Sequence, residues 1–261
     1  MIYPFLYLFN ISISMDGTVI SNMTLVPKGF SFDSYQTILG FKFIKTGFYN
    51  SILRVVLGTS ATFLACTLTA YALSKRKLPF RTLLTMLMVF TMFFNGGLIP
   101  SYILIKNLGL IDSIWSLIVP TIIPTFSMLI MRNYFMSIPI DLEESAKIDG
   151  AGDWRTLFQV IIPISKPIIA TIVLWEMVYH WNAWFDSMIY IRTAEKQVLQ
   201  LVMRNIVISG QLTDSTFITS ALTPEKLKAA TIMIATLPII CVYPFLQKYF
   251  IKGIIVGSLK G

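Results

Sequence analysis

Five long apolar stretches most constrain how this chain can fold. They cover roughly residues 48–73, 82–105, 113–135, 167–191 and 229–250. A helix needs about 20 predominantly apolar residues to cross the hydrocarbon core of a bilayer, and each stretch meets that length. The chain is 55% hydrophobic and 13% charged, whereas soluble proteins have about 45–50% apolar and about 25% charged residues. The sequence therefore predicts an all-α membrane protein with five complete transmembrane helices.

The basic residues in the short loops predict the orientation of these helices. Residues 74–81 contain three lysine or arginine residues in a row and a fourth at Arg81, whereas residues 106–112 contain only Lys106. Because lysine and arginine are concentrated on the cytoplasmic side, the first loop is expected inside and the second outside. Counting onward places residues 136–166 and the C-terminal tail in the cytoplasm and residues 192–228 outside. We attribute the net charge of +8 to this topology and expect membrane lipid, not nucleic acid, as its counterpart.

A charged, glycine-containing segment interrupts the apolar chain at residues 143–163. Acidic residues follow Pro139, where the dipole of a starting helix favours carboxylates. Asp149-Gly150 predicts the end of that helix, with a glycine that tolerates positive φ. Trp154, Leu157, Phe158 and Ile161 then recur at helical spacing. The pattern predicts two short cytoplasmic helices that dock on a soluble partner; the alternative is an amphipathic connector without a partner.

This segment resembles the EAA loop of the permease subunits of ABC importers, where a short helix pair fits a groove on an ATPase. Glu144-Ser145-Ala146 stands where that family has Glu-Ala-Ala, and Val160-Ile161-Ile162-Pro163 closes the motif. The resemblance implies contact with the ATPase by residues Glu143, Glu144, Ser145, Ala146, Asp149, Gly150, Ala151, Phe158 and Pro163.

The resemblance to maltose-type carbohydrate permeases runs over nearly the whole chain. Phe94–Lys106 looks like the Gly-Gly-Leu-Ile-Pro stretch of permeases for complex oligosaccharides, and Pro139–Pro167, His180–Trp184 and Leu199–Leu201 also match. It implies a type I ABC importer permease fold in the bacterial cytoplasmic membrane. It further implies a second homologous permease, an ATPase dimer and an extracytoplasmic solute-binding protein as partners. ATP and magnesium are expected in the ATPase, and no cofactor in this chain.

The N-terminal apolar piece, Ile2–Ile13, is too short to span a membrane. It resembles the outer end of the first helix of these permeases, so we expect that the chain lacks most of that helix. A five-span protein with an interfacial anchor is the alternative. The predicted organisation is a helix remnant at 1–13, an external segment at 14–47 and the permease domain at 48–261. The last includes a cytoplasmic coupling loop at 139–163 and an external loop at 192–228.

Polar residues inside two predicted spans suggest a path for a solute. If residues 167–191 form one helix, Glu176, Tyr179, His180 and Asp186 fall on one stripe. Ionisable residues in a span are costly and usually face a bundle interior or a water-filled path. The alternative is a structural hydrogen bond, for instance from Glu176 to His180. The residues expected to line the path are Asn95, Glu176, Tyr179, His180, Asn182, Trp184 and Asp186.

The external loop at 192–228 is longer than most connections, which have about 4–6 residues. The permeases that the chain resembles use a loop here to contact the docked binding protein. We expect Gly210, Gln211 and Leu212 to make that contact; a partly disordered connector is the alternative.

Motifs for chemistry are absent from the sequence. It has no Gly-x-x-x-x-Gly-Lys-Ser/Thr phosphate loop, and His180 is its only histidine. Both cysteines, Cys66 and Cys241, lie in apolar runs. We therefore expect no catalytic residue and no metal site, and predict the permease subunit of an ATP-driven sugar or oligosaccharide importer. The alternatives are an ABC permease for another solute, or an ion-coupled transporter with Glu176, His180 and Asp186 as proton carriers.

Overall fold

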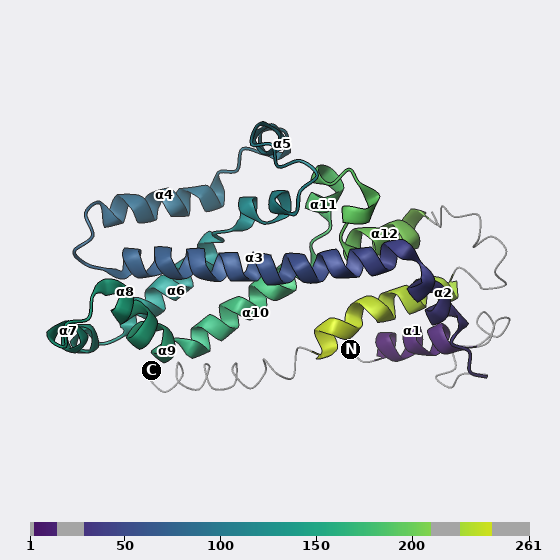
Figure 1. Cartoon of the computed structure of the whole chain (residues 1–261), viewed down its shortest axis with the longest axis horizontal. Helices are drawn as coiled ribbons and strands as arrows, with labels where there is room; N and C mark the ends of the chain where they lie inside the picture. The colour runs from purple at the N-terminus through teal and green to yellow at the C-terminus, as the bar shows by residue number, and fades with distance from the viewer. Residues whose placement is uncertain (1–2, 15–28, 210–224, 242–261) are drawn as a thin grey trace. The chain divides into compact units, whose positions relative to one another are not determined.

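The computed structural model describes residues 3–14, 29–209 and 225–241 of the chain (Figure 1). Within these ranges the chain is helical and contains no β-strand. Its described residues divide into two compact units. One unit contains those up to Leu53 and those within Trp181–Tyr243, and the other contains Arg54–His180. Two helices, α3 (Lys42–Ser74) and α10 (Lys166–Asn182), contribute residues to both units. The predicted all-helical class is thus confirmed for the described residues.

Helix α3 is the one helix among the described residues that is long and apolar enough to cross a membrane alone. Three bent helix pairs reach that length only together. The first is α4 (Arg81–Phe93) with α5 (Leu98–Asn107); the second is Ile114–Thr121 with α6 (Thr125–Ser137); the third is Asp153–Ile164 with α10. They bend by 115°, 49° and 84°. The described residues therefore hold one to four spans, and the count of five complete helices stays a prediction. The span expected at 229–250 lies partly outside the described residues, which are helical over 225–241.

Local sequence explains the bends. Between α4 and α5, Gly97 has a φ of 87°, and its N–H donates to the side-chain oxygen of Asn95 at 2.8 Å. Proline at 124 precedes α6 with an extended ψ of 109°, which starts a new helix direction. Between the cytoplasmic segment and α10, Ser165 leaves helical geometry at ψ 9°. Each bend thus falls at glycine, at proline or at a residue outside helical geometry.

The expected single helix over 167–191 was wrong. Helix α10 ends at Asn182, and α11 (Phe185–Tyr190) begins after Trp184, whose φ of −129° and ψ of −29° are not helical. The carboxylate of Asp186 accepts the backbone N–H of Ser187 at 2.8 Å in the first turn of α11. A carboxylate there stabilises a new helix start. Positions beyond Asn182 consequently do not continue the helical face of α10.

The core of the unit formed by Arg54–His180 lies where the C-terminal half of α3 packs on α6, the 153–164 segment and α10. Its centre is apolar and almost fully buried, which fixes these four elements against one another. The residues of this core cluster are Cys66, Ala70, Tyr71, Leu73, Met128, Met131, Phe135, Leu157, Ile161 and Ile172.

In the other unit, the first turns of α3 hold the chain that leads into α12 (Leu199–Ser209). The Asn50 amide donates to the carbonyls of Glu195 and Gln197 at 2.7 and 3.0 Å, and the N–H of Leu199 donates to Ser51 Oγ at 2.9 Å. The same unit contains α1 (Tyr3–Ile13) and α2 (Asp33–Gly40). These hydrogen bonds position the start of α12 against α3.

Candidate functional site

The polar segment at 139–163 folds as two helical pieces that meet at Gly150. Helix α7 (Ile140–Ile148) comes first, followed by α8 (Asp153–Thr156), a π-helical turn and α9 (Ile162–Ile164). At the turn, the N–H of Gly150 donates to the carbonyl of Lys147 at 3.0 Å, and that of Ala151 donates to Ala146 at 2.9 Å. This pair of hydrogen bonds is a Schellman motif. The predicted turn with positive φ at Gly150, observed at 78°, is confirmed.

Glycine is required at position 150 for its backbone conformation, not because a side chain would clash with other atoms. A Cβ atom added to Gly150 would have no other atom within 4 Å. Its left-handed backbone costs roughly 1–2 kcal/mol for a residue with a Cβ. The nearby Gly152, with a φ of −73°, carries no such requirement. The two glycines therefore offer a matched pair for experiments.

Pro163 lies inside the last helical turn of the segment instead of stopping it. Leu157–Ile161 forms a π-helical turn, and the helix continues to Ile164 before Ser165 ends it. Proline has no N–H and its ring crowds the carbonyl of the preceding turn. A wider π turn before it relieves that crowding, and the helix continues to Ile164.

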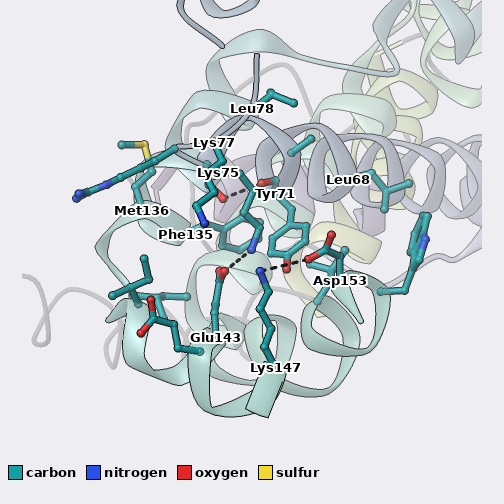
Figure 2. Close-up of a pocket in the computed structure, with 18 of the residues that line it drawn as sticks. Leu68, Tyr71, Lys75, Lys77, Leu78, Phe135, Met136, Glu143, Lys147 and Asp153 are labelled. Atoms are coloured by element: carbon teal, nitrogen blue, oxygen red, sulfur yellow. Dashed lines mark hydrogen bonds and ion pairs between the residues drawn. The ribbon is translucent and has the colours of Figure 1, made fainter. Parts of the chain in front are cut away.

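A cleft of about 1020 Å³ lies between the C-terminal end of α3, the end of α6, α7 and α8. Figure 2 shows Lys75 and Glu143 pointing toward each other across it. The Lys75 ammonium forms an ion pair with the Glu143 carboxylate and lies 3.8 Å from the centroid of the Tyr71 ring. Only 24% and 19% of the two charged side chains are exposed. Solvent therefore screens this ion pair less than a surface pair.

A second ion pair crosses the turn itself. Lys147 Nζ lies 3.9 Å from Asp153 Oδ1, which connects the end of α7 with the first turn of α8 (Figure 2). Both side chains are more than half exposed. Exposed pairs of this kind typically contribute less than about 1 kcal/mol. The Lys75–Glu143 pair is therefore the stronger link between this segment and α3.

The segment has two faces of opposite character. Leu157 and Ile161 are 1% and 0% exposed inside the core cluster, whereas Trp154 and Phe158 are 67% and 48% exposed. The rings of Trp154 and Phe158 stack with centroids 6.2 Å apart. At the end of α7, Ile148 is also 86% exposed. Large apolar side chains gathered on an otherwise polar segment indicate a surface that binds another protein.

The predicted coupling residues divide between the two sides of this segment. Glu143 and the more exposed Glu144 line the cleft, and Ala146 and Ala151 are half-buried next to the turn. The remaining predicted residues are on the outer surface or at the end of the segment. These residues are exposed: Ser145, Asp149, Gly150, Phe158 and, in the last turn, Pro163.

The residues expected to line a solute path have different environments. Glu176 is 6% exposed and accepts a hydrogen bond from Ser127 Oγ at 3.0 Å, which links α10 to α6. His180 is 1% exposed and lies over Gly58 of α3, where an added Cβ would be 2.5 Å from His180 Nε2. A structural hydrogen bond, the alternative for Glu176, is therefore observed, but its partner is Ser127. Tyr179, one residue from His180, is 46% exposed.

The other expected path residues do not belong to that buried group. Asn95 is exposed in the break between α4 and α5. Asn182 is exposed at the end of α10, and Trp184 and Asp186 are half-buried at the break before and within α11. These three belong to the unit that begins again at Trp181. Their role in a path stays a prediction.

Some expectations fall outside what the structure describes. Gly210, Gln211 and Leu212, the expected contact with a binding protein, lie outside the described residues. Within the described ranges, no group of three or more His, Cys, Asp or Glu residues could hold a metal ion.

Sequence reasoning missed three residues that matter to the site. Lys75 was used only as a topology marker, although its partner Glu143 was singled out. Gly58 and Ser127 were not noted, because small residues in an apolar stretch give no signal of the helix they contact. The opposite charges of two predicted cytoplasmic loops were the available clue for Lys75 and Glu143.

Comparisons with known proteins place this geometry in context. The sequence model of the family "Binding-protein-dependent transport system inner membrane component" matches residues 61–256. The polygalacturonan/rhamnogalacturonan transport system permease protein YtcP of Bacillus subtilis is 40% identical, with 100% of this chain and 93% of that protein covered. Protein LplC of B. subtilis is also 40% identical and covers 100% of this chain and 90% of its own length. A chain in the crystal structure of a bacterial ABC transporter involved in the import of the acidic polysaccharide alginate has a TM-score of 0.91 and 33% identity. That match covers 95% of this chain and 90% of the other.

Proposed function

This chain belongs to the family of binding-protein-dependent transport system inner membrane components, and we propose that it forms half of the path of an ATP-driven oligosaccharide importer. The fold matches over nearly the full length of a chain from an ABC importer. The names of YtcP and of the alginate importer support a carbohydrate as the substrate class. ATP and Mg²⁺ would bind a separate ATPase dimer, and a second, homologous permease would complete the path.

The observation that carries the coupling part of the proposal is the two-faced segment after the turn at Gly150. Leu157 and Ile161 are buried against α3, α6 and α10, while Trp154 and Phe158 project outward within the same two turns. A displacement of the outer face therefore acts directly on the packed core. Close-packed interiors transmit such a displacement because they have few voids that could absorb it.

The ion pair between Lys75 and Glu143 provides a second connection. It joins α7 to the end of α3, a helix whose cytoplasmic half forms part of the same core. When the ATPase dimer closes on ATP, we expect α7, α8 and α9 to move as one piece with α3 and α10. The path would then change from inward-facing to outward-facing.

An extracytoplasmic solute-binding protein would deliver the saccharide. We propose that residues 209–215, which include Gly210, Gln211 and Leu212, contact it. Deletion of residues 209–215 should leave the subunit in the membrane but abolish stimulation of ATP hydrolysis by the binding protein. Unchanged stimulation would refute this contact.

The function itself is tested by reconstitution. The chain is co-expressed with its partner permease and the ATPase, and the complex is placed in proteoliposomes with the saccharide-loaded binding protein. The proposal expects uptake of a labelled oligosaccharide that requires ATP, the ATPase and the binding protein. Uptake driven by a proton gradient without ATP would contradict it and support an ion-coupled transporter.

A further inference from the structure

The helical backbone breaks at Trp184, between the end of α10 at Asn182 and the start of α11 at Phe185. Helix α10 has 17 residues, which extend about 26 Å at 1.5 Å per residue. A bilayer core is about 30 Å thick, so a helix that starts at the cytoplasmic side with Lys166 brings Trp184 close to the external boundary. A non-helical backbone near membrane depth is tolerated where it is buried in protein or lines a water-filled cavity. Broken helices of this kind form substrate sites in transporters.

Helix α12 presents one arginine to this break. Its buried face comprises Leu199, Leu201, Val202, Met203 and Ile206. Arg204 and Asn205 of the same helix are half-buried. The guanidinium carbon of Arg204 lies 4.4 Å from the centroid of the Trp184 ring. Because Ser51 and Asn50 of α3 bind the chain at the start of α12, the arginine is held on a fixed element.

Within the described residues, the N–H donors of the Arg204 guanidinium have no recorded hydrogen-bond acceptor. Among the residues that the structure describes, its recorded interaction is the contact with the Trp184 ring, and it takes part in no ion pair or hydrogen bond. Contact through the ring face uses the charge but not the five N–H donors, which lie in the guanidinium plane. Such a fork binds a carboxylate through two parallel hydrogen bonds.

A carboxylate of the same unit, Glu195, is already engaged. It pairs with Lys42 at 3.4 Å. A hydrogen bond from its own backbone N–H, and then the contact with Lys42, lower the pKa of the Glu195 carboxyl. The other nearby carboxylate, Asp186, accepts the N–H of Ser187. These contacts occupy both carboxylates, and no recorded ion pair joins either of them to Arg204.

We propose that Arg204, held over Trp184, binds the carboxylate of an acidic sugar at the outer end of the path, and that this contact selects oligosaccharides with uronate groups. The half-buried indole leaves ring surface beside the guanidinium for the apolar C–H face of a sugar. Trp184 would then contact the sugar ring of a uronate, and Arg204 would bind its negative charge. This inference rests on the function proposed above, because it names the substrate class of that path.

The test compares two saccharides that differ only in charge. An oligogalacturonide and its methyl ester share one sugar backbone, and the ester lacks the carboxylate. Uptake of each is measured in proteoliposomes with the complete complex, its ATPase and its binding protein. The variants are Arg204→Gln and Arg204→Lys. A matched control is Lys42→Gln, which removes a cation from the same unit that already has a partner.

Hydrogen bonds to charged groups contribute on the order of a tenfold change in binding. Arg204→Gln should therefore lower the ratio of acid uptake to ester uptake about tenfold. Arg204→Lys should give an intermediate ratio, and Lys42→Gln should leave the ratio unchanged. The amount of assembled complex and the ATP hydrolysis stimulated by the binding protein should stay at the wild-type level. If the wild-type complex does not import the ester, the test uses uptake of the acid alone. Acid uptake should then fall in Arg204→Gln and persist in Lys42→Gln.

Several outcomes would overturn the inference. An equal loss of acid and ester uptake would assign Arg204 to structure or to docking of the binding protein. Unchanged acid uptake in Arg204→Gln, or a wild-type complex that carries the ester and rejects the acid, would exclude a uronate contact. A wild-type complex that carries a neutral oligosaccharide but neither of these two saccharides would overturn the uronate inference and leave the proposed function intact. A wild-type complex that carries no oligosaccharide in the presence of ATP would contradict the proposed function itself, so the two failures are distinguished.

Discussion

Lys75, in the turn that follows α3, forms an ion pair with Glu143 in the first turn of α7. The two residues are 68 positions apart in the sequence. Their side chains are mostly buried, and the ammonium of Lys75 lies 3.8 Å from the centroid of the Tyr71 ring. The pair therefore connects the polar cytoplasmic segment to the longest helix of the chain through an electrostatic contact that solvent screens weakly.

Substitution of Gly150 should weaken the coupling turn without affecting the spans. Gly150→Ala places a Cβ at a φ of 78°, which costs roughly 1–2 kcal/mol. We expect less ATPase to co-purify with this variant and slower ATP-dependent uptake, with normal insertion into the membrane. Gly150→Asn should be milder, because asparagine visits this region more readily.

The control for this variant is Gly152→Ala. Gly152 has ordinary backbone angles and open space around a Cβ, so its replacement should leave ATPase association unchanged. Equal effects at both positions would show that the left-handed backbone at 150 is not what matters.

The exposed aromatic residues after the turn should contribute to partner binding rather than to folding. Trp154→Ala and Phe158→Ala remove side chains that are 67% and 48% exposed, and each should reduce ATPase affinity by about 1–2 kcal/mol or more, as interface anchors do. The melting temperature of the isolated subunit should stay unchanged.

The neighbouring buried residue provides the contrast. Leu157 is 1% exposed. The substitution Leu157→Ala should therefore lower the free energy of unfolding by about 2–5 kcal/mol. Thermal unfolding and ATPase pull-down measured on all three variants would separate the two faces. A loss of stability in Trp154→Ala would place that side chain in the fold and not at an interface.

Gly58 should tolerate no side chain while His180 is present. An added Cβ would lie 2.5 Å from His180 Nε2, and overpacking of this kind typically costs about 1–3 kcal/mol. Gly58→Ala should therefore lower the melting temperature, and the double variant Gly58→Ala/His180→Ala should recover part of the loss. Gly40→Ala, with nothing within 4 Å of its Cβ, serves as the control. Equal destabilisation of the single and double variants would contradict the contact.

Ser127 and Glu176 should act as one pair. Their hydrogen bond joins α6 to α10 inside the core, so Ser127→Ala, Glu176→Gln and the double variant should show non-additive losses of stability in a double-mutant cycle. The coupling energy should be about 0.5–3 kcal/mol. If instead Glu176→Gln reduces sugar uptake with unchanged stability and no coupling to Ser127, Glu176 faces the path as the sequence pattern suggested.

The parts of the fold that depend on residues close together in the sequence were predictable from it. Asp149-Gly150 marks a helix end by local backbone preference alone, and the structure has the turn there. The apolar stripe of Leu157 and Ile161 likewise follows from helical spacing, and both residues are buried.

What the sequence could not give depends on tertiary contacts. Residues 167–191 are continuously apolar enough to indicate one helix, yet the chain leaves helical geometry at Trp184, beside Arg204 of α12. Burial of Glu176 against Ser127 was equally hidden, because helical periodicity places a residue on a face without showing which helix covers that face.

The most direct test of coupling through the cytoplasmic segment is the number of saccharide molecules imported per ATP hydrolysed. It is measured in proteoliposomes for the wild type, Lys75→Glu, Glu143→Lys and the double charge reversal. Each single reversal places like charges together in the cleft. We expect each to lower the ratio while ATP hydrolysis continues, and the double reversal to restore it substantially. Wild-type ratios in both single variants would contradict transmission through this ion pair.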